Sequence, residues 1–315
     1  MDLIAPDYYT DFSCIAGACR HSCCIGWEID VDEDALARYE ALPAPFGDTV
    51  RNSIDFIGDS PHFRLGTGER CPFLRQDGLC EMILRLGEDA LCQICTDHPR
   101  FRSYFGDHTE IGLGLCCEAA ADLIVRREAP MSLITLSHDD APSVSDPQEQ
   151  TLLSFCDMLL SILQDRSLSM EERLEELSET CACPPERPLS EWAEKLMGLE
   201  RLDEGWTALL STLCSAASEK DASLLHTPAW ERAFEQLGVY FVYRHLPDAL
   251  EDGDVSSKAA FAVLSLRLLR ALCSRLFEDS GNVSLSDLAN FSRMYSGEIE
   301  YSEENLWQIY AWLMD

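Results

Sequence analysis

Cysteine is concentrated at the start of this 315-residue chain. Thiolates are soft ligands that select zinc or iron–sulfur clusters over magnesium or calcium. Glycine and proline recur around these cysteines, so metal bonds have to replace part of the hydrophobic core there. The pattern predicts a metal-holding domain. Ten of the fifteen cysteines fall within the first 117 residues, at Cys14, Cys19, Cys23, Cys24, Cys71, Cys80, Cys92, Cys95, Cys116 and Cys117.

A disulfide framework is the first alternative, and plain buried thiols are the second. Disulfides need an oxidising compartment and are typical of small exported chains. The sequence opens with Met-Asp-Leu-Ile-Ala-Pro-Asp, which lacks the basic and apolar segments of a signal peptide. The longest apolar stretch, Ala259 to Leu272, contains Arg267 and Arg270 and is shorter than the roughly 20 residues that cross a bilayer. We therefore expect a cytoplasmic protein with no membrane partner.

The chain is strongly acidic. Its 56 acidic and 24 basic residues give a formal charge of −32. Such a field repels the phosphates of nucleic acids, so a polynucleotide partner is disfavoured. The excess charge has two interpretations: solvated faces that keep the protein soluble, or attraction to a basic, lysine-bearing protein substrate.

A change in amino-acid composition divides the sequence into two expected domains. Residues 137–148 are polar and contain prolines, as in a linker or long loop. Residues 1–136 form the expected cysteine-rich metal- or cluster-binding domain, and residues 149–315 the expected α-helical domain. The predicted fold class is mainly α, with an irregular cysteine-rich N-terminal part packed on a C-terminal helical bundle.

Helix signals dominate the second half. Ser169 with Glu172 three residues later predicts a capping box, and Thr227 before Pro228 predicts an N-cap and a first turn. The apolar segment 256–277 predicts the central buried helix, which Gly281 would end. Further helices are expected at 33–42, at 119–127 and after Ser302.

The cysteines form four groups along the chain. Only one group, Cys92-x2-Cys95, has the spacing of an ordinary zinc knuckle, and His98 is either a nitrogen ligand there or a structural histidine. Because one zinc ion or one cluster needs four ligands, either two centres exist or several thiols do not bind metal. The other groups are Cys14-x4-Cys19-x3-Cys23-Cys24, Cys71-x8-Cys80 and Cys116-Cys117.

The residues next to the cysteines also follow a recognisable sequence pattern. The chain resembles the flagellin lysine N-methylase family through Phe12-Ser13-Cys14, Cys19-Arg20-His21-Ser22-Cys23-Cys24-Ile25-Gly26-Trp27-Glu28-Ile29-Asp30, Cys71-Pro72-Phe73-Leu74, Gly78-Leu79-Cys80, Leu86-Gly87-Glu88, Leu91-Cys92-Gln93-Ile94-Cys95 and His98-Pro99-Arg100. A fainter similarity continues in Tyr240-Phe241-Val242-Tyr243-Arg244-His245-Leu246-Pro247 and Phe291-Ser292-Arg293.

The resemblance implies an enzyme that transfers methyl groups from S-adenosylmethionine to lysine side chains of flagellin and carries a [4Fe-4S] cluster. Zinc is the alternative or second metal. Cys117 stands where the family has proline, so we leave it out of the ligand set. The predicted metal ligands are Cys14, Cys19, Cys23, Cys24, Cys71, Cys80, Cys92, Cys95 and Cys116.

Lysine methylation needs a neutral amine, whereas a free lysine has a pKa near 10.4. Tyr8, Asp30 and Glu118 are candidates for orienting the amine; the alternatives are a packing aromatic, a surface charge and a helix cap. Arg100 is a candidate for binding the carboxylate of S-adenosylmethionine or the cluster sulfurs, with a structural salt bridge as the alternative. The alternative functions are a non-catalytic, metal-stabilised adaptor and an electron-transfer protein.

Overall fold

The chain folds into two compact units. The computed structural model describes residues 1–138, 146–214 and 223–314. The smaller unit is Ser13–Arg100, and the larger unit combines Met1–Phe12 with Phe101–Asp315. These bounds differ from the predicted domains 1–136 and 149–315, because residues 101–136 pack with the helical half. Most of the predicted linker 137–148 lies outside the described residues.

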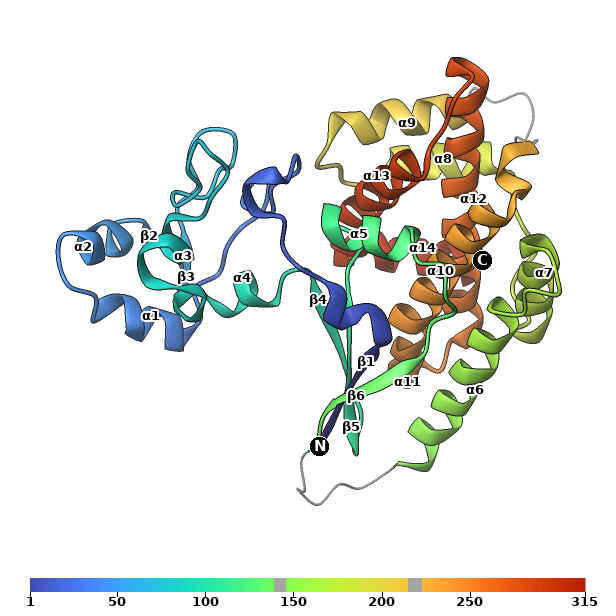
Figure 1. Ribbon diagram of the computed structural model, residues 1–315, viewed down its shortest axis with the longest axis horizontal. Helices are drawn as coiled ribbons and strands as arrows, with labels where there is room; N and C mark the ends of the chain where they lie inside the picture. The colour runs from blue at the N-terminus through green and yellow to red at the C-terminus, as the bar shows by residue number, and fades with distance from the viewer. Residues whose placement is uncertain (139–145, 215–222, 315) are drawn as a thin grey trace. The chain divides into compact units, whose positions relative to one another are not determined.

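Short elements and a small apolar core make up the smaller unit (Figure 1). In this core Tyr39 stacks on Phe63, and Phe63 meets Phe73 edge to face. The core also contains Cys71 and Cys92. The helix expected at 33–42 is present as α1. The elements are α1 (Glu33–Glu40), α2 (Phe46–Arg51), the antiparallel pair β2 (Ile54–Ile57) and β3 (Ser60–Phe63), α3 (Glu81–Leu86) and α4 (Gln93–Asp97).

A four-stranded sheet, which the sequence did not predict, lies in the larger unit. Its order is β4 (Arg100–Tyr104), β5 (His108–Leu113), β1 (Asp2–Pro6) and β6 (Leu133–Ser137). Strand β1 is parallel to β5 and antiparallel to β6. The first residues of the chain are therefore part of the larger unit.

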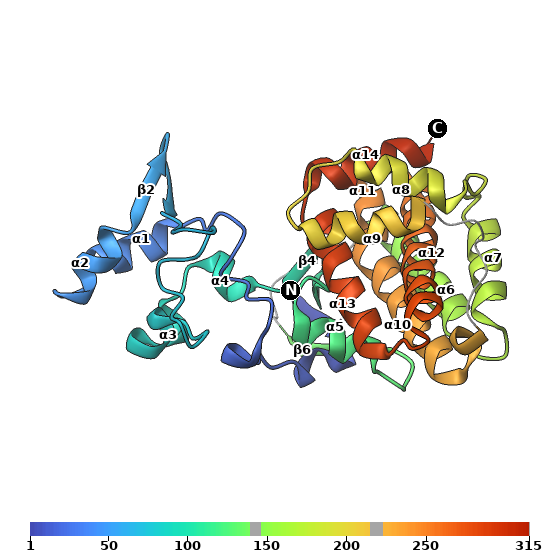
Figure 2. The same ribbon diagram turned by 90° about the horizontal axis from the view of Figure 1, so that it is seen from above.

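Helices form the rest of the larger unit, and two of them are central (Figures 1 and 2). Helix α12 packs against α10, α14, α13 and α9, while α10 also packs against α5 and α6. The bounds are α5 (Glu118–Val125), α6 (Pro147–Leu163), α7 (Met170–Thr180), α8 (Leu189–Met197), α9 (Glu204–Cys214), α10 (Pro228–His245), α11 (Ala249–Asp252), α12 (Val255–Ser280), α13 (Leu285–Tyr295), a π-helix (Ser296–Glu300) and α14 (Glu303–Met314).

Several helix predictions are confirmed, as is the mainly α fold class. Helix α12 covers the expected 256–277 and is buried on most sides, with Gly281 at its C-cap in the left-handed conformation (φ 73°). Ser169 and Glu172 form the expected capping box at α7. Thr227 is the N-cap of α10, but its side chain makes no capping hydrogen bond. Metal binding by the N-terminal part stays a prediction.

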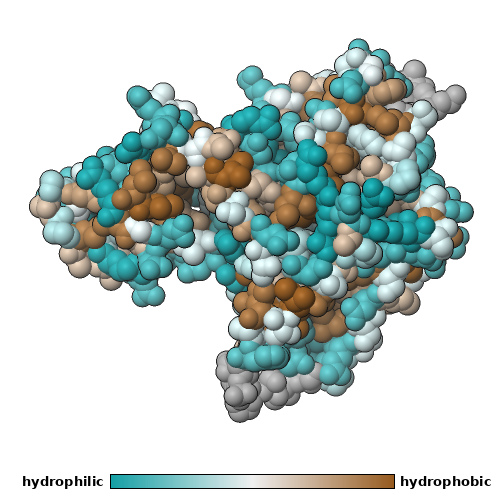
Figure 3. Space-filling view, in the orientation of Figure 1, coloured by the Kyte–Doolittle hydropathy of each residue, from teal (hydrophilic) through white to brown (hydrophobic). Residues whose placement is uncertain are grey.

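The surface carries mostly polar side chains. In Figure 3 they separate the apolar residues of the visible face into patches. Trp307 on α14 is the most exposed of the large hydrophobic residues, at 78%. Within the described part of the chain, no helix is both long and apolar enough to span a membrane.

Candidate functional site

Five thiols of the smaller unit lie in or against its apolar core, although they come from segments far apart in the sequence. Cys71 donates its backbone N–H to the Cys24 carbonyl at 2.8 Å. Cys80 and Cys92 each stand immediately before a helix, α3 and α4, and Cys95 lies within α4. Each is buried or half-buried and packs in or against the core of this unit.

The pKa values of these thiols show that they are close enough to influence one another. Burial, together with the charges of Cys24, Cys80 and Cys92, raises the pKa of Cys71 to about 12. A hydrogen bond with Cys23 lowers the pKa of Cys24 to about 7. A hydrogen bond between Cys92 and Cys95 lowers the pKa of Cys92 and raises that of Cys95. Repulsion between neighbouring thiolates would therefore oppose their joint ionisation.

The donor set is of the type that iron–sulfur clusters and zinc sites use. All fifteen cysteines fall within the described residues and are present as thiols. Among these residues, no three Cys, His, Asp or Glu side chains are arranged to hold one metal ion. A [4Fe-4S] cluster needs four thiolates, each on a different iron, and therefore a wider spacing than one zinc ion needs. Five neighbouring thiols are sufficient in number and type.

The structure does not bring all nine predicted ligands into one unit. Cys14 and Cys23 are exposed and Cys19 is half-buried, in the segment that opens the smaller unit. The Cys14 sulfur accepts a hydrogen bond from the Ala16 N–H at 3.4 Å. Cys116 belongs to the larger unit.

Arg100 and His98 lie at the end of α4, the helix that carries Cys95. The Arg100 guanidinium donates to the carbonyls of Thr96 (3.0 Å) and His98 (3.5 Å), where a cation is favourable at a helix C-terminus. Burial and the Arg100 charge lower the pKa of His98 to about 4, so its imidazole is neutral near pH 7. The His98 ring lies 5.9 Å from the ring of Trp27. Arg100 thus stabilises the helix beside the thiols.

The three candidates for orienting an amine are divided between the two units. Tyr8 is buried in the core of the larger unit, where the Arg127 guanidinium lies 5.5 Å from its ring centre. Asp30 is exposed in the smaller unit, and its backbone pairs with that of His62. Glu118 is the first residue of α5, whose N-cap is Cys117, so Glu118 is an acidic residue in the first turn of the helix, where a negative charge is favourable.

A buried ionic network in the larger unit was not predicted. Glu300, which ends the π-helix, has a fully buried carboxylate. It lies 2.6 Å from Nε2 of His245 and accepts hydrogen bonds from the Tyr240 hydroxyl at 3.0 and 3.1 Å. The Arg244 guanidinium stands 3.5 Å from Glu300 and donates to the Tyr240 oxygen at 2.6 Å. The Arg244 charge and the His245 hydrogen bond outweigh desolvation and lower the pKa of Glu300 to about 2.

The π-helix explains how Glu300 reaches this position. Tyr301 donates its N–H to the Ser296 carbonyl at 3.1 Å, five residues back, which widens the turn. The inserted turn directs Glu300 toward α10. π-Helical turns recur at functional sites. A buried ion pair with a strongly displaced pKa is also typical of such sites.

Tyr301 connects the network to the surface. Its ring packs on Arg244, with 4.8 Å between the guanidinium carbon and the ring centre, while 43% of the residue is exposed. Its hydroxyl hydrogen-bonds to the thiol of Cys116, and desolvation raises the pKa of both groups. Of this network, the sequence indicated only the stretch from Tyr240 to Pro247, through its resemblance to the family. No local sequence pattern predicted Glu300 and Tyr301, because their partners are distant along the chain.

The fold and site together define a mainly α-helical protein with a cysteine-rich unit and a buried ionic network in its helical unit. Residues 191–315 match the family described as FliB lysine N-methylase C-terminal domain. This match, together with the relatives described next, confirms the resemblance to the flagellin lysine N-methylase family. The matched range contains Tyr240, Arg244, His245, Glu300 and Tyr301.

Individual proteins agree with this assignment. Two proteins named Lysine-N-methylase, from Salmonella choleraesuis (strain SC-B67) and Salmonella typhimurium (strain LT2), are 28% identical over 181 residues, which is 54% of this chain and 44% of each relative. The Flagellar biosynthetic protein FliU of Salmonella muenchen is 29% identical over 137 residues, 41% of this chain and 79% of that protein. The match thus spans less than half the length of the two methylases. No solved structure matches the chain.

Proposed function

We propose that this chain is a protein-lysine N-methyltransferase that uses S-adenosylmethionine and acts on flagellin. The observation that carries the proposal is the coincidence of the family match at 191–315 with the buried network around Glu300. The methylase names of the relatives and the cysteine spacing of the N-terminal part give further support.

The reaction sets clear requirements. The lone pair of a neutral lysine nitrogen attacks the methyl carbon of the sulfonium, and the carbon–sulfur bond breaks. Its electron pair stays on sulfur, giving the neutral thioether S-adenosylhomocysteine, and the amine loses a proton to solvent or a base. Since a free lysine is protonated at pH 7, the enzyme has to favour the neutral amine.

Tyr301 and Arg244 meet this requirement. Tyr301 is partly exposed, and a lysine amine that reached its hydroxyl would donate a hydrogen bond to the phenol oxygen, which also hydrogen-bonds to Cys116. The Arg244 charge disfavours a second cation next to it, which lowers the pKa of a lysine docked at Tyr301. Glu300 and Tyr240 hold Arg244 in place, and His245 in turn holds Glu300.

The iron–sulfur cluster is part of the same proposal. Four of the five neighbouring cysteines would supply the thiolates that it needs: Cys24, Cys71, Cys80, Cys92 and Cys95. Cys14, Cys19 and Cys23 remain candidates for ligand exchange or for a second centre. When bound, such a cluster supplies electron transfer or Lewis acidity. A reducing cytosol keeps these thiols available for metal, so we propose a cytoplasmic site of action.

The direct test is methyl transfer. Anaerobically purified protein, incubated with flagellin from the source organism and S-adenosylmethionine, should add mass increments of methyl groups to flagellin lysines. Cys71→Ala or Cys95→Ala should lose iron and activity together, whereas Cys156→Ala and Cys273→Ala, in the core of the larger unit, should retain iron. Iron-loaded protein that binds flagellin without modifying it would favour the adaptor function instead.

Tyr301→Phe tests the proposed role of the phenol. Removing the hydroxyl should lower kcat roughly tenfold or more, because one hydrogen bond in the transition state is lost, while iron content stays unchanged. Tyr104→Phe is the matched control, since Tyr104 is 74% exposed and also lies in the larger unit. Equal kcat values for the two variants would remove Tyr301 from the mechanism.

A further inference from the structure

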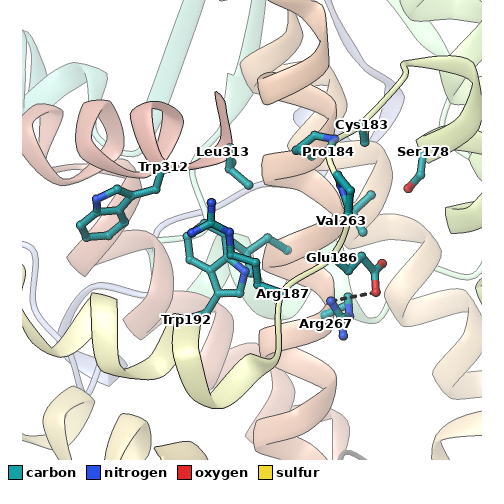
Figure 4. Close-up of a pocket in the computed structure, with 13 residues that line it drawn as sticks. Ser178, Cys183, Pro184, Glu186, Arg187, Trp192, Val263, Arg267, Trp312 and Leu313 are labelled. Carbon is teal, nitrogen blue, oxygen red and sulfur yellow. Dashed lines mark ion pairs between the residues drawn. The ribbon is translucent and has the colours of Figure 1, made fainter. Parts of the chain in front are cut away.

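The exposed face of α14 carries a large aromatic side chain without a partner. Trp307 is 78% exposed, and among the described residues no aromatic ring or cation contacts its ring. The second tryptophan of α14 differs from it: the ring of Trp312 lies 6.4 Å from that of Trp192, and the Lys195 ammonium stands 4.8 Å from its centre (Figure 4). Tryptophan anchors many protein–protein interfaces, where the partner buries the ring.

The pocket beside Trp312 is satisfied by the chain's own groups. It has a volume of about 300 Å³ and lies between α7, α8, α12 and α14 (Figure 4). Arg267 pairs with Glu186 at 2.9 Å and Arg187 with Glu191 at 3.3 Å, so the guanidinium charges are already compensated. The exposed face with Trp307 is therefore the side of α14 that remains open to another molecule.

Acidic side chains dominate the two segments next to Trp307, which are 244–252 and 301–308. Arg244 is the only lysine or arginine of these segments, and it is half-buried. Asp252 pairs with the buried Lys258, whereas Glu251, Glu303 and Glu304 form no ion pair with a described residue. The exposed charged residues of the two segments are all acidic: Asp248, Glu251, Asp252, Glu303 and Glu304.

The two segments border one surface because Tyr310 joins them. Tyr310 lies three residues after Trp307 on the same side of α14, and its hydroxyl stands 3.2 Å from Nδ1 of His245. The same nitrogen lies 4.0 Å from a carboxylate oxygen of Asp248. Tyr301 packs on the residue that precedes His245. The acids of both segments therefore lie on the surface that carries Trp307 and Tyr301.

Such a surface selects a cationic partner that also has apolar length. The stem of a lysine packs on a tryptophan ring while its ammonium meets a carboxylate. Nucleic acid is repelled, because its phosphates carry the same sign of charge as the surface. A second copy of this chain is disfavoured as well, since a twofold dimer would bring the same acidic face against itself.

We propose that this face of α14 docks the lysine-bearing substrate protein. Trp307 packs on the stem of one lysine, Glu303 and Glu304 pair with ammonium groups beside it, and a further lysine reaches Tyr301. The inference rests on the proposed function, which names a lysine-bearing substrate, and adds the surface that holds it. Because the contact at Trp307 is equally strong in the ground state and in the transition state, its loss should raise KM and leave kcat nearly unchanged.

Calorimetric titration of the full chain with flagellin from the source organism, without a methyl donor, tests the face in the absence of turnover. Trp307→Ala should weaken binding roughly tenfold or more, because the aromatic anchor is lost. Tyr104→Ala is the matched control, since Tyr104 is also an aromatic residue of the larger unit and is 74% exposed. This control should bind flagellin as the unmodified chain does.

A pair of charge variants separates the face from the overall field. The double variant Glu303→Gln/Glu304→Gln removes two charges from the face and should weaken binding several-fold. Glu175→Gln/Glu176→Gln removes the same net charge from an exposed, adjacent pair on α7 and should leave binding nearly unchanged. Equal losses in the two double variants would assign the attraction to the whole molecule and overturn the proposed face.

Three further results would overturn the assignment. They are equal affinities of Trp307→Ala and its control, no binding of flagellin to the unmodified chain, and sedimentation of the unmodified chain as a dimer that Trp307→Ala dissociates. Mass analysis of methylated flagellin is scored separately. Binding at this face without methylation refutes only the proposed function, whereas methylation with an unchanged KM in Trp307→Ala refutes only the docking face.

Discussion

At the residue scale, the Glu300 network shows how a charged group is kept ionised in an apolar core. Burying a carboxylate alone raises its pKa, yet the pKa of Glu300 falls to about 2, so its partners outweigh desolvation. The groups that face it are Tyr240, Arg244 and His245 of α10 and Ser296 of the π-helix. Removing one partner of such a pair leaves an uncompensated buried charge.

We expect Glu300→Gln to lower the free energy of unfolding by about 3 kcal/mol at pH 7, because it leaves Arg244 buried without its carboxylate. Urea unfolding followed by far-ultraviolet circular dichroism, which reports mainly the helical unit, measures the loss. Glu304→Gln on α14 is an exposed control and should change stability by less than about 0.5 kcal/mol. Similar stabilities for both variants would contradict a structural role for the network.

The difference in stability between the unmodified chain and Glu300→Gln should depend on pH. The folded-state pKa of Glu300 is depressed below its ordinary value of 4.5, so its stabilising charge is fully present above about pH 4.5. The contribution is lost as the pH falls toward about 2, where the folded protein also binds the proton. The stability difference between the unmodified chain and Glu300→Gln should therefore shrink between pH 4.5 and pH 2.5. A difference that is constant over this range would point to lost packing instead of lost charge.

At the element scale, helix caps and helix ends could be predicted from the sequence, whereas pairings between distant segments could not. Capping and helix ends depend on residues a few positions apart, so the capping box of α7 and the left-handed Gly281 after α12 were predictable. Strand β1 pairs with β5, where Ile4 faces Glu110, and no short-range pattern encodes that pairing. Likewise, the cysteines indicated metal chemistry from their spacing, whereas Glu300 meets α10 only in the folded chain.

The α7 capping box offers a quantitative check at this scale. The Ser169 hydroxyl accepts from the Glu172 N–H at 3.3 Å, and the Glu172 carboxylate accepts from the Ser169 N–H at 2.7 Å. Ser169→Ala should cost about 1 kcal/mol of stability in urea unfolding, because the N–H of Glu172 loses its partner. Ser161→Ala, at an exposed position within α6, should cost less than about 0.5 kcal/mol. A loss no larger than that of the control would mean that water replaces the cap.

At the scale of the whole molecule, the two units differ in the size of their apolar cores. The larger unit has an extensive apolar core, whereas the core of the smaller unit is small and includes Cys71 and Cys92. If the smaller unit holds the proposed cluster, chelation under anaerobic, reducing conditions should remove hydrogen-exchange protection from 13–100 and leave most protection in α10 and α12. One cooperative transition of the entire chain, or unchanged protection in 13–100, would show that stability does not divide in this way.

The net charge also acts at the scale of the whole molecule. A net charge of −32 attracts a lysine-bearing protein over several ångströms of solvent, and salt screens that attraction within a Debye length of about 8–10 Å near 0.1–0.15 M. If the proposed methylation occurs, raising the salt from 0.05 to 0.5 M should increase KM for flagellin several-fold, because capture weakens, and should leave kcat nearly unchanged, because the buried network is poorly screened. A short lysine peptide of zero net charge is the control substrate and should show a much smaller change in KM. If both substrates respond equally, the salt acts on the site itself, and the acidic surface has no part in substrate capture.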